Sequence, residues 1–180
     1  MIVHAASLLL TASAATAELP VCGPTARIIF REGAPVDLFT IENLSANGIT
    51  DWQIGEIEIL LGPSAGRLVF DTVPGGGGRN VAQPFAPRDA EGAALADLPL
   101  VEDGAEGMAL SFRAFVPGGR FTFSIDMDDR LAGYGTTVAG PEIEGALVRV
   151  HFTDHDRHRA TVEAPFDALS VARPTTPCLG

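Results

Sequence analysis

Apolar and polar residues alternate along much of this chain with a period of two. Between Phe121 and Met127 every second residue is apolar, and the segments 148–152 and 57–61 show a similar pattern. A period of two places one face of a β-strand in the core, whereas a helix would repeat about every 3.6 residues. The same criterion predicts further strands at 26–32, 36–43, 66–72, 107–113, 159–163 and 168–172.

Residues typical of turns separate these segments. Glycine, proline, asparagine or aspartate occurs at 33–35, 47–48, 62–64, 117–119, 140–141 and 154–156. The glycine-rich run 74–78 is expected to be a surface loop, and only 90–98, with its several alanines, is expected to form a helical turn or two. Many short strands with little helix predict an all-β fold, an antiparallel β-sandwich with Greek-key or jelly-roll-like connections. A closed barrel is the alternative.

Length and charge narrow the classes of partner. The 180 residues suit a single domain with one core. All 12 basic residues are arginines, and the 23 acidic residues give a net charge of -11. Such a charge repels phosphate backbones and anionic lipid surfaces, so neither nucleic acid nor a membrane surface is an expected partner. A protein with this negative charge attracts cations, so a bound metal ion is compatible with the composition.

The first 17 residues have the features of a signal peptide. They contain no acidic residue, an apolar stretch at 5–10 and a run of small residues that ends at Ala17. We therefore expect cleavage after Ala17, a mature domain of residues 18–180, and a secreted or periplasmic protein. A short N-terminal helix or strand of the mature fold is the alternative. No later stretch approaches the length of a transmembrane segment.

The two cysteines lie near the ends of the expected mature domain. Cys22 follows the expected cleavage point closely, and Cys178 is two residues from the C-terminus. In an oxidising compartment this arrangement predicts one disulfide that ties the two ends together. A redox pair or a set of metal thiolates would need a much shorter spacing between the cysteines.

Acidic residues gather where one predicted strand ends. Asp126 and Asp128 are expected on one face of the strand, and Asp129 begins the turn that follows. Adjacent carboxylates repel one another, and a hard cation with oxygen ligands removes that cost, so the residues suggest a calcium site. The spacing is not that of an EF-hand. The positive charge of Arg130 counts against a tight site there, and a solvated acidic turn that keeps the protein soluble is the alternative.

Other acidic residues could join this group if the fold brings them to the same edge. Glu142 and Glu144 flank an isoleucine in another acidic segment, and Asp37 and Asp71 lie at the ends of other predicted strands. Together with the first three aspartates they would supply six or more oxygen ligands. The candidate calcium ligands are Asp126, Asp128, Asp129, Glu142 and Glu144.

The histidines suggest a different metal. His155 and His158 lie in an acidic turn with Asp154 and Asp156, and with His151 on the preceding strand they could hold zinc or copper. A polar hairpin connection is the plainer interpretation. No nucleophile with a histidine partner occurs in a recognisable motif, so we do not expect an enzyme. The alternative function is a periplasmic metal-dependent enzyme or accessory subunit that uses this turn.

Two aromatic residues are candidates for ligand contact. Trp52 opens a predicted strand, where it could stack on a ligand or pack against the core. Tyr134 lies between two glycines near the acidic triplet, so an aromatic face and carboxylates could meet there.

Several segments, taken in order, resemble a known family. The segments 29–43, 66–72, 83–85, 121–129 and 140–148 resemble the bacterial proteins named after the core of the sponge aggregation factor. The resemblance implies an extracellular, non-enzymatic module of a self-associating, calcium-linked adhesive assembly. We therefore expect a secreted binding or adhesion module, assisted by calcium, that contacts a surface polysaccharide, another protein or other copies of itself.

Overall fold

The computed structural model describes residues 21–33, 37–45, 51–76, 82–131 and 138–177, without the side chains of residues 21, 22 and 177. In this part of the chain it contains ten β-strands and one 3-10 helix. The elements are β1 (Val21–Arg31), β2 (Asp37–Asn43), β3 (Gln53–Leu60), β4 (Val69–Asp71), β5 (Ala86–Leu95), β6 (Gly107–Asp128), η1 (Gly140–Ile143), β7 (Leu147–Thr153), β8 (Arg159–Pro165), β9 (Val171–Ala172) and β10 (Thr175–Pro177). No described helix has the length and apolarity needed to cross a bilayer.

The alternation in the sequence appears directly in the burial of the strands. In β2 and β7 every second residue is buried. Phenylalanines of neighbouring strands meet in the core, where Phe39 of β2 stacks on Phe123 of β6 with ring centroids 5.1 Å apart. Burial of these rings and of the aliphatic side chains around them favours folding. The apolar faces predicted from the period of two are therefore the core faces.

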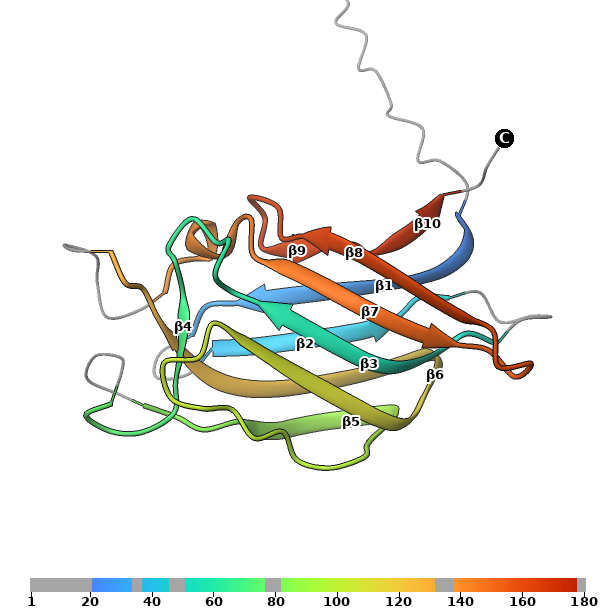
Figure 1. The fold of residues 1–180 in the computed structure, drawn as a ribbon, viewed down its shortest axis with the longest axis horizontal. Coiled ribbons are helices and arrows are strands. Elements are labelled where there is room, and N and C mark those ends of the chain that lie inside the picture. The colour runs from blue at the N-terminus through green and yellow to red at the C-terminus, as the bar shows by residue number, and fades with distance from the viewer. Residues whose placement is uncertain (1–20, 34–36, 46–50, 77–81, 132–137, 178–180) are drawn as a thin grey trace, which may run out of the picture.

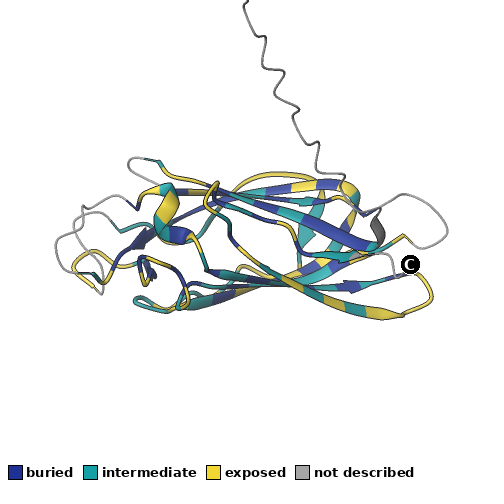
Figure 2. Ribbon diagram, turned by 90° about the horizontal axis from the view of Figure 1, so that it is seen from above, coloured by how far each residue is buried: buried dark blue, intermediate teal, exposed yellow. Residues whose placement is uncertain are grey.

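The strands form one antiparallel path in the order β10-β1-β2-β6-β3-β7-β8 (Figure 1). The long strand β6 belongs to both halves of this path. Its C-terminal part pairs with β2 and its N-terminal part pairs with β3. In Figure 1, β3 and β7 pass in front of β1 and β2, and Figure 2 shows the two layers from the side.

This arrangement confirms the all-β antiparallel fold predicted from the sequence. The two layers correspond to the expected sandwich, and the unbroken strand order that curls around one core has the character of the barrel alternative. Strand β6 creates this mixture because it passes from one layer to the other without a break.

The turn that the sequence predicts at 117–119 is instead a bend within β6. Gly118 has φ +78°, and a Cβ added to Gly119 would lie 2.9 Å from the carbonyl oxygen of Gly92 on β5. The register between β5 and β6 also shifts between Glu91 and Ala93, which marks a bulge. Glycine and a bulge are the usual means of bending a strand sharply, so the same residues that suggest a turn here produce a bend within one strand.

The helical turn expected at 90–98 is also wrong, because β5 extends to Leu95. Ala90 lies opposite Phe121 and Ala93 opposite Phe115 on β6. Small alanines beside large rings allow the two strands to approach closely. Tertiary pairing with β6 therefore overrides the helical preference of alanine.

The first and last described strands pair with each other. Val21 of β1 lies opposite Pro177 of β10. Cys22 is on β1, but Cys178 lies outside the described residues, so the disulfide between them stays a prediction. The expected signal peptide, residues 1–17, also lies outside the described part of the chain.

Candidate metal centre

Three aspartates come together where β4 pairs with the C-terminal end of β6. Asp71 lies directly opposite Asp126 in the antiparallel register, and Asp128 is two residues farther along β6. Opposite residues and residues two apart share a face of a sheet, so the three carboxylates point to the same side. One oxygen from each lies within 4.8 Å of the other two.

Asp37 approaches the same group from the other side of β6. It opens β2 opposite Ile125, is 2% exposed, and accepts a hydrogen bond of 3.3 Å from the N–H of Gly33. Burial, together with the charges of Asp126 and Asp128, raises the pKa of Asp37 to about 8, although hydrogen bonds from backbone N–H groups oppose the shift. We define the acidic cluster as Asp37, Asp71, Asp126 and Asp128, because their charges act on one another, although the atoms close enough to share one ion belong to Asp71, Asp126 and Asp128.

The pKa values of Asp71 and Asp126 are shifted in the same direction as that of Asp37. Burial, contact with Asp128 and a smaller contribution from Asp103 raise the pKa of Asp71 to about 6. Burial and the charges of Asp128 and Asp71 raise the pKa of Asp126 to about 7. None of the described groups that shift these pKa values is basic. Among the described residues, the groups that act on these carboxylates therefore add no positive charge.

Asp71 carries an unsatisfied acceptor. The residue is 2% exposed, and its Oδ1 has no hydrogen-bond partner among the residues that the structure describes. A buried acceptor without a hydrogen bond lowers the stability of the folded state by about 1–3 kcal/mol, and by more if the group is charged. The neighbouring Asp103 is oriented by the N–H groups of Thr72 and Val73, which both donate to its Oδ1. The backbone thus fixes the surroundings of Asp71 while one of its own oxygens stays available.

An all-oxygen ligand set of this kind suits a hard cation. Calcium binds oxygens at about 2.3–2.6 Å, so two of its ligands can be up to about 5 Å apart. The 4.8 Å limit on the separations among Asp71, Asp126 and Asp128 agrees with this. A divalent cation at this position would supply the missing positive charge and could accept the free electron pairs of Asp71.

The residues proposed from the sequence divide into two sets. Asp126 and Asp128 are in the cluster. Asp129 is buried beside it, but its Oδ1 accepts a hydrogen bond from the N–H of Leu131. Glu142 lies in η1 and accepts from the N–H of Ala139, and Glu144 is exposed directly after η1. The structure does not bring either glutamate into the group of Asp71, Asp126 and Asp128.

Arg130 does not neutralise the cluster. Its guanidinium pairs with Glu106 at 3.0 Å and donates to the carbonyl oxygen of Gly104. The positive charge that counted against a cation site in the sequence is thus used elsewhere. Asp103 was not identified from the sequence, because nothing in the segment 96–106 indicates that it returns to β4.

The histidines are separated rather than gathered. His151 of β7 faces Glu58, whereas His155 pairs with Asp156 and His158 pairs with Asp154. Asp154 accepts from both the backbone N–H and the Nδ1 of His158, each at 2.8 Å. This contact raises the pKa of His158, and these bonds lower the pKa of Asp154 against the opposing effect of its burial. The geometry is that of a closed hairpin turn.

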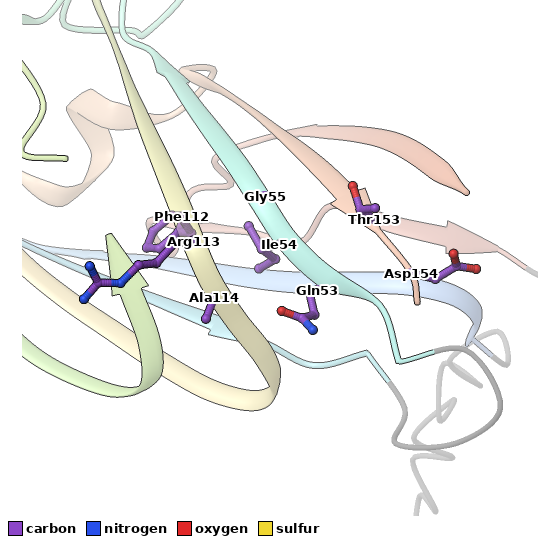
Figure 3. Close-up of a pocket in the computed structure, with 8 residues that line it drawn as sticks. All are labelled: Gln53, Ile54, Gly55, Phe112, Arg113, Ala114, Thr153 and Asp154. Carbon is purple, nitrogen blue, oxygen red and sulfur yellow. The ribbon is translucent and has the colours of Figure 1, made fainter. Parts of the chain in front are cut away.

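A pocket of about 310 Å³ lies where β3 and β6 separate (Figure 3). Their pairing ends at Glu56 and Ser111, and the buried amide of Asn43 donates to the carbonyl oxygens of Trp52 and Phe115 at the far end. Both hydrogen bonds are 2.9 Å, so one nitrogen holds the two strands together there. The gap between β3 and β6 is therefore too narrow to admit an additional strand.

The two aromatic candidates have different outcomes. Trp52 is half-buried and packs against the core, which agrees with the core alternative. Tyr134 lies outside the described residues. Compared with known proteins, this chain matches no family model, no curated protein and no solved structure.

Proposed function

We propose that this protein is a non-enzymatic, extracytoplasmic binding module that takes a calcium ion at its acidic cluster. The observation that carries the proposal is the buried carboxylate of Asp71, which lies beside Asp126 and Asp128 and has an oxygen without a hydrogen-bond partner in the described part of the chain. A structure that keeps like charges together in its interior needs a proton or a cation there. Calcium is the cation that an all-carboxylate site favours outside the cell.

Calcium binding would change the energetics of one end of the molecule. Strands β4 and β6 meet at Asp71 and Asp126, so repulsion between these side chains opposes the pairing of the strands. A bound cation converts that repulsion into attraction to a common centre. Asp37 would extend the effect to β2, on the other side of β6. The ion would therefore hold β4 and β6 together and reduce the negative charge that Asp37 of β2 faces.

The proposed activity is adhesion, either to a surface polysaccharide or protein or between copies of the module. The resemblance of several segments to the aggregation factor core family and the acidic composition support this proposal. With a net charge of -11 the copies repel one another, and bound calcium reduces that repulsion. The proposal assigns no catalytic residue, because the histidines that an enzyme site would need have separate carboxylate partners.

The first experiment is a calcium titration of the thermal midpoint of the purified protein. At a concentration one hundred times the dissociation constant, binding stabilises the folded state by about 2.7 kcal/mol. For a chain of this size that raises the midpoint by about 5–10 °C. The increase should disappear in Asp71→Asn and Asp128→Asn. Light scattering with calcium, and again after a chelator, then measures self-association.

The matched control is Glu144→Gln, which removes an exposed carboxylate outside the cluster. This variant should keep the full response to calcium. If calcium does not move the midpoint of the native protein, or moves that of Asp71→Asn equally, the proposed site is wrong. If calcium binds but light scattering stays unchanged, the site stands and self-association is removed from the proposal.

A further inference from the structure

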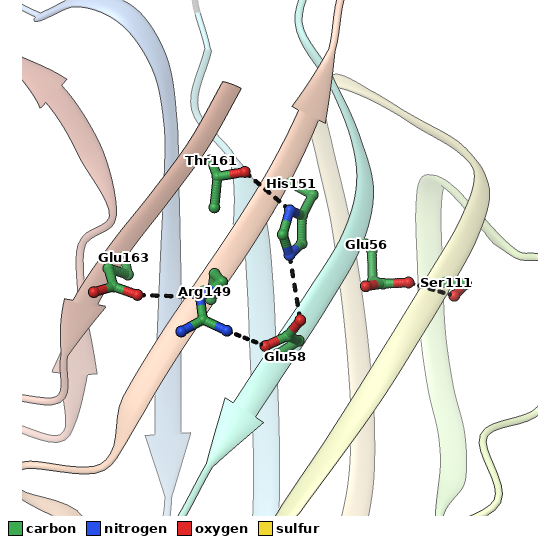
Figure 4. A network of polar contacts seen from close by, with 7 residues as sticks. All are labelled: Glu56, Glu58, Ser111, Arg149, His151, Thr161 and Glu163. Atoms are coloured by element: carbon green, nitrogen blue, oxygen red, sulfur yellow. Dashed lines mark hydrogen bonds and ion pairs between the residues drawn. The ribbon is translucent and has the colours of Figure 1, made fainter. Parts of the chain in front are cut away.

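A second group of ligands lies on the outer face of β3 and β7 (Figure 4). Glu56 and Glu58 are two residues apart on β3, and His151 of β7 is directly opposite Glu56. The three side chains therefore share a face. One ligand atom from each lies within 4.8 Å of the other two. All three are half-buried.

The orientation of His151 is fixed by a partner outside the group. Its Nδ1 lies 3.0 Å from the hydroxyl oxygen of Thr161 on β8. Its Nε2 faces Oε1 of Glu58 at 3.3 Å, while Oε2 of Glu58 accepts a hydrogen bond of 2.6 Å from Arg149. Each side chain thus uses one atom for a structural partner and directs the other toward the same point.

Glu56 follows the same pattern. Its Oε2 accepts a hydrogen bond of 3.2 Å from the hydroxyl of Ser111 on β6, and its other oxygen is not used in that bond. The guanidinium of Arg149 bridges Glu58 and Glu163, so one positive charge serves two carboxylates. With Glu56 added, this face carries three carboxylates and one arginine. The carboxylates of this network therefore outnumber its arginine.

The separation of the two best-placed atoms matches a tetrahedral metal. Zinc binds histidine nitrogen and carboxylate oxygen at about 2.0–2.2 Å, so two ligands at the tetrahedral angle are about 3.3–3.5 Å apart. The distance between Nε2 of His151 and Oε1 of Glu58 is 3.3 Å. Outer partners that hold the second atom of a ligating histidine or carboxylate are typical of metal sites. Thr161 and Arg149 occupy these positions here.

We propose that Glu56, Glu58 and His151 bind a zinc ion on the outer face of the sheet, with Thr161 and Arg149 orienting two of the ligands. The mixed nitrogen and oxygen set favours zinc over calcium, which prefers oxygen alone. The His151 that the sequence grouped with His155 and His158 instead takes its co-ligands from β3. This proposal does not depend on the calcium site, because the two groups share no residue.

The test is isothermal titration of the purified protein with zinc chloride, at saturating calcium. The native protein should bind one zinc at this face. His151→Ala and Glu58→Gln should each weaken its binding at least tenfold, and Thr161→Val should weaken it about tenfold by freeing Nδ1. The nitrogen resonance of His151 Nε2 should shift on addition of zinc, which locates the ion directly.

The control is His158→Ala, which removes the other histidine that lies in a potential ligand group, with Asp154 and Asp156. This variant should bind zinc as the native protein does. A cooperative thermal transition with a midpoint close to that of the native protein would show that each variant is folded. Absence of zinc binding in the native protein, equal affinity in His151→Ala, or loss in His158→Ala instead would each overturn the proposal.

Discussion

Two groups of carboxylates lie on this sheet, and repulsion between like charges is reduced to different degrees in the two. In the acidic cluster, Asp71 is 2% exposed and none of the described groups that shift its pKa is basic. On the outer face, Glu58 is half-exposed to solvent and lies between Arg149 and His151. In the first group like charges repel one another in a largely buried environment, whereas in the second Arg149 and water offset part of the negative charge.

The difference teaches that the number of carboxylates at a site says little about its energetics. Burial decides whether like charges are costly, because water screens exposed charges and not buried ones. Removing charge should therefore have opposite effects in the two regions. It should stabilise the protein at the acidic cluster and destabilise it slightly on the outer face.

The largest expected effect is a dependence of stability on pH without calcium. Folding raises the pKa of Asp37 to about 8 and that of Asp126 to about 7, from about 3.9 in the unfolded chain. The folded state then binds more protons than the unfolded state between about pH 4 and pH 8, so stability falls as pH rises through that range. A shift of two pKa units at one of these carboxylates alone changes the free energy of unfolding by about 2.7 kcal/mol across this pH range.

Thermal melts in a chelator from pH 5 to pH 8 measure this effect. The midpoint should fall by about 5–10 °C over the range, and saturating calcium should remove most of the fall. A midpoint that is flat or rises with pH in the chelator would show that the cluster is not strained, and the contrast with the outer face would be lost.

A smaller effect is expected from Asp71→Asn without calcium. The substitution keeps the shape of the side chain and removes one of the mutually repelling charges. It should raise the free energy of unfolding at pH 7.5 by about 1–2 kcal/mol, since one pKa unit of a neighbour is worth about 1.4 kcal/mol. At pH 4.5, below the raised pKa values of Asp37, Asp71 and Asp126, these three carboxylates are already protonated in the native protein, and the gain should be much smaller. Urea melts at the two pH values measure the difference.

Asp129→Asn is the control for that experiment. Its side-chain oxygen can still accept the hydrogen bond from the N–H of Leu131, and the residue is outside the group of three. No comparable gain at pH 7.5 is expected. An equal gain would mean that the effect comes from the net charge of the protein rather than from the cluster.

The smallest effect is expected on the outer face. Arg149→Gln breaks the ion pairs with Glu58 and Glu163, and Arg149 has 35% of its side chain exposed. Exposed ion pairs contribute about 0.2–1 kcal/mol, so the loss should be of that size and should shrink in 1 M salt. Arg113→Gln, at an exposed arginine that lines the pocket, is the control and should be neutral. A gain in stability for Arg149→Gln would contradict the comparison.

The strands were largely predictable because the alternation of apolar and polar residues in each strand shows which face is buried. Phe39 and Ile41, or Val148 and Val150, alternate with polar residues because one side of each strand meets the core. What the local pattern could not contain is the path of the chain through space. The same glycines at 118–119 suit a turn and a corner, and only the pairing with β5 distinguishes the two.

The candidate site shows the same limit. Asp126 and Asp128 are two residues apart on one strand, so their grouping was predictable. Asp71 joins them through the register of β4, and Asp103 through a loop, which are contacts between residues far apart in the chain. The sequence named Asp71 only as a residue that would matter if strands met at one edge. His151 likewise takes its neighbours from β3 and β8 rather than from the histidine-rich turn.

The pairing of β1 with β10 bears on how an adhesive module would respond to tension. Val21 and Pro177 form the outermost pair, so a pull on the two ends of the domain would open the ladder one pair at a time instead of shearing it as a whole. Strands peeled in this way yield at low force. Cys22 is the next residue after Val21, and Cys178 follows Pro177 in the sequence. A covalent link between them would stand where the peeling begins.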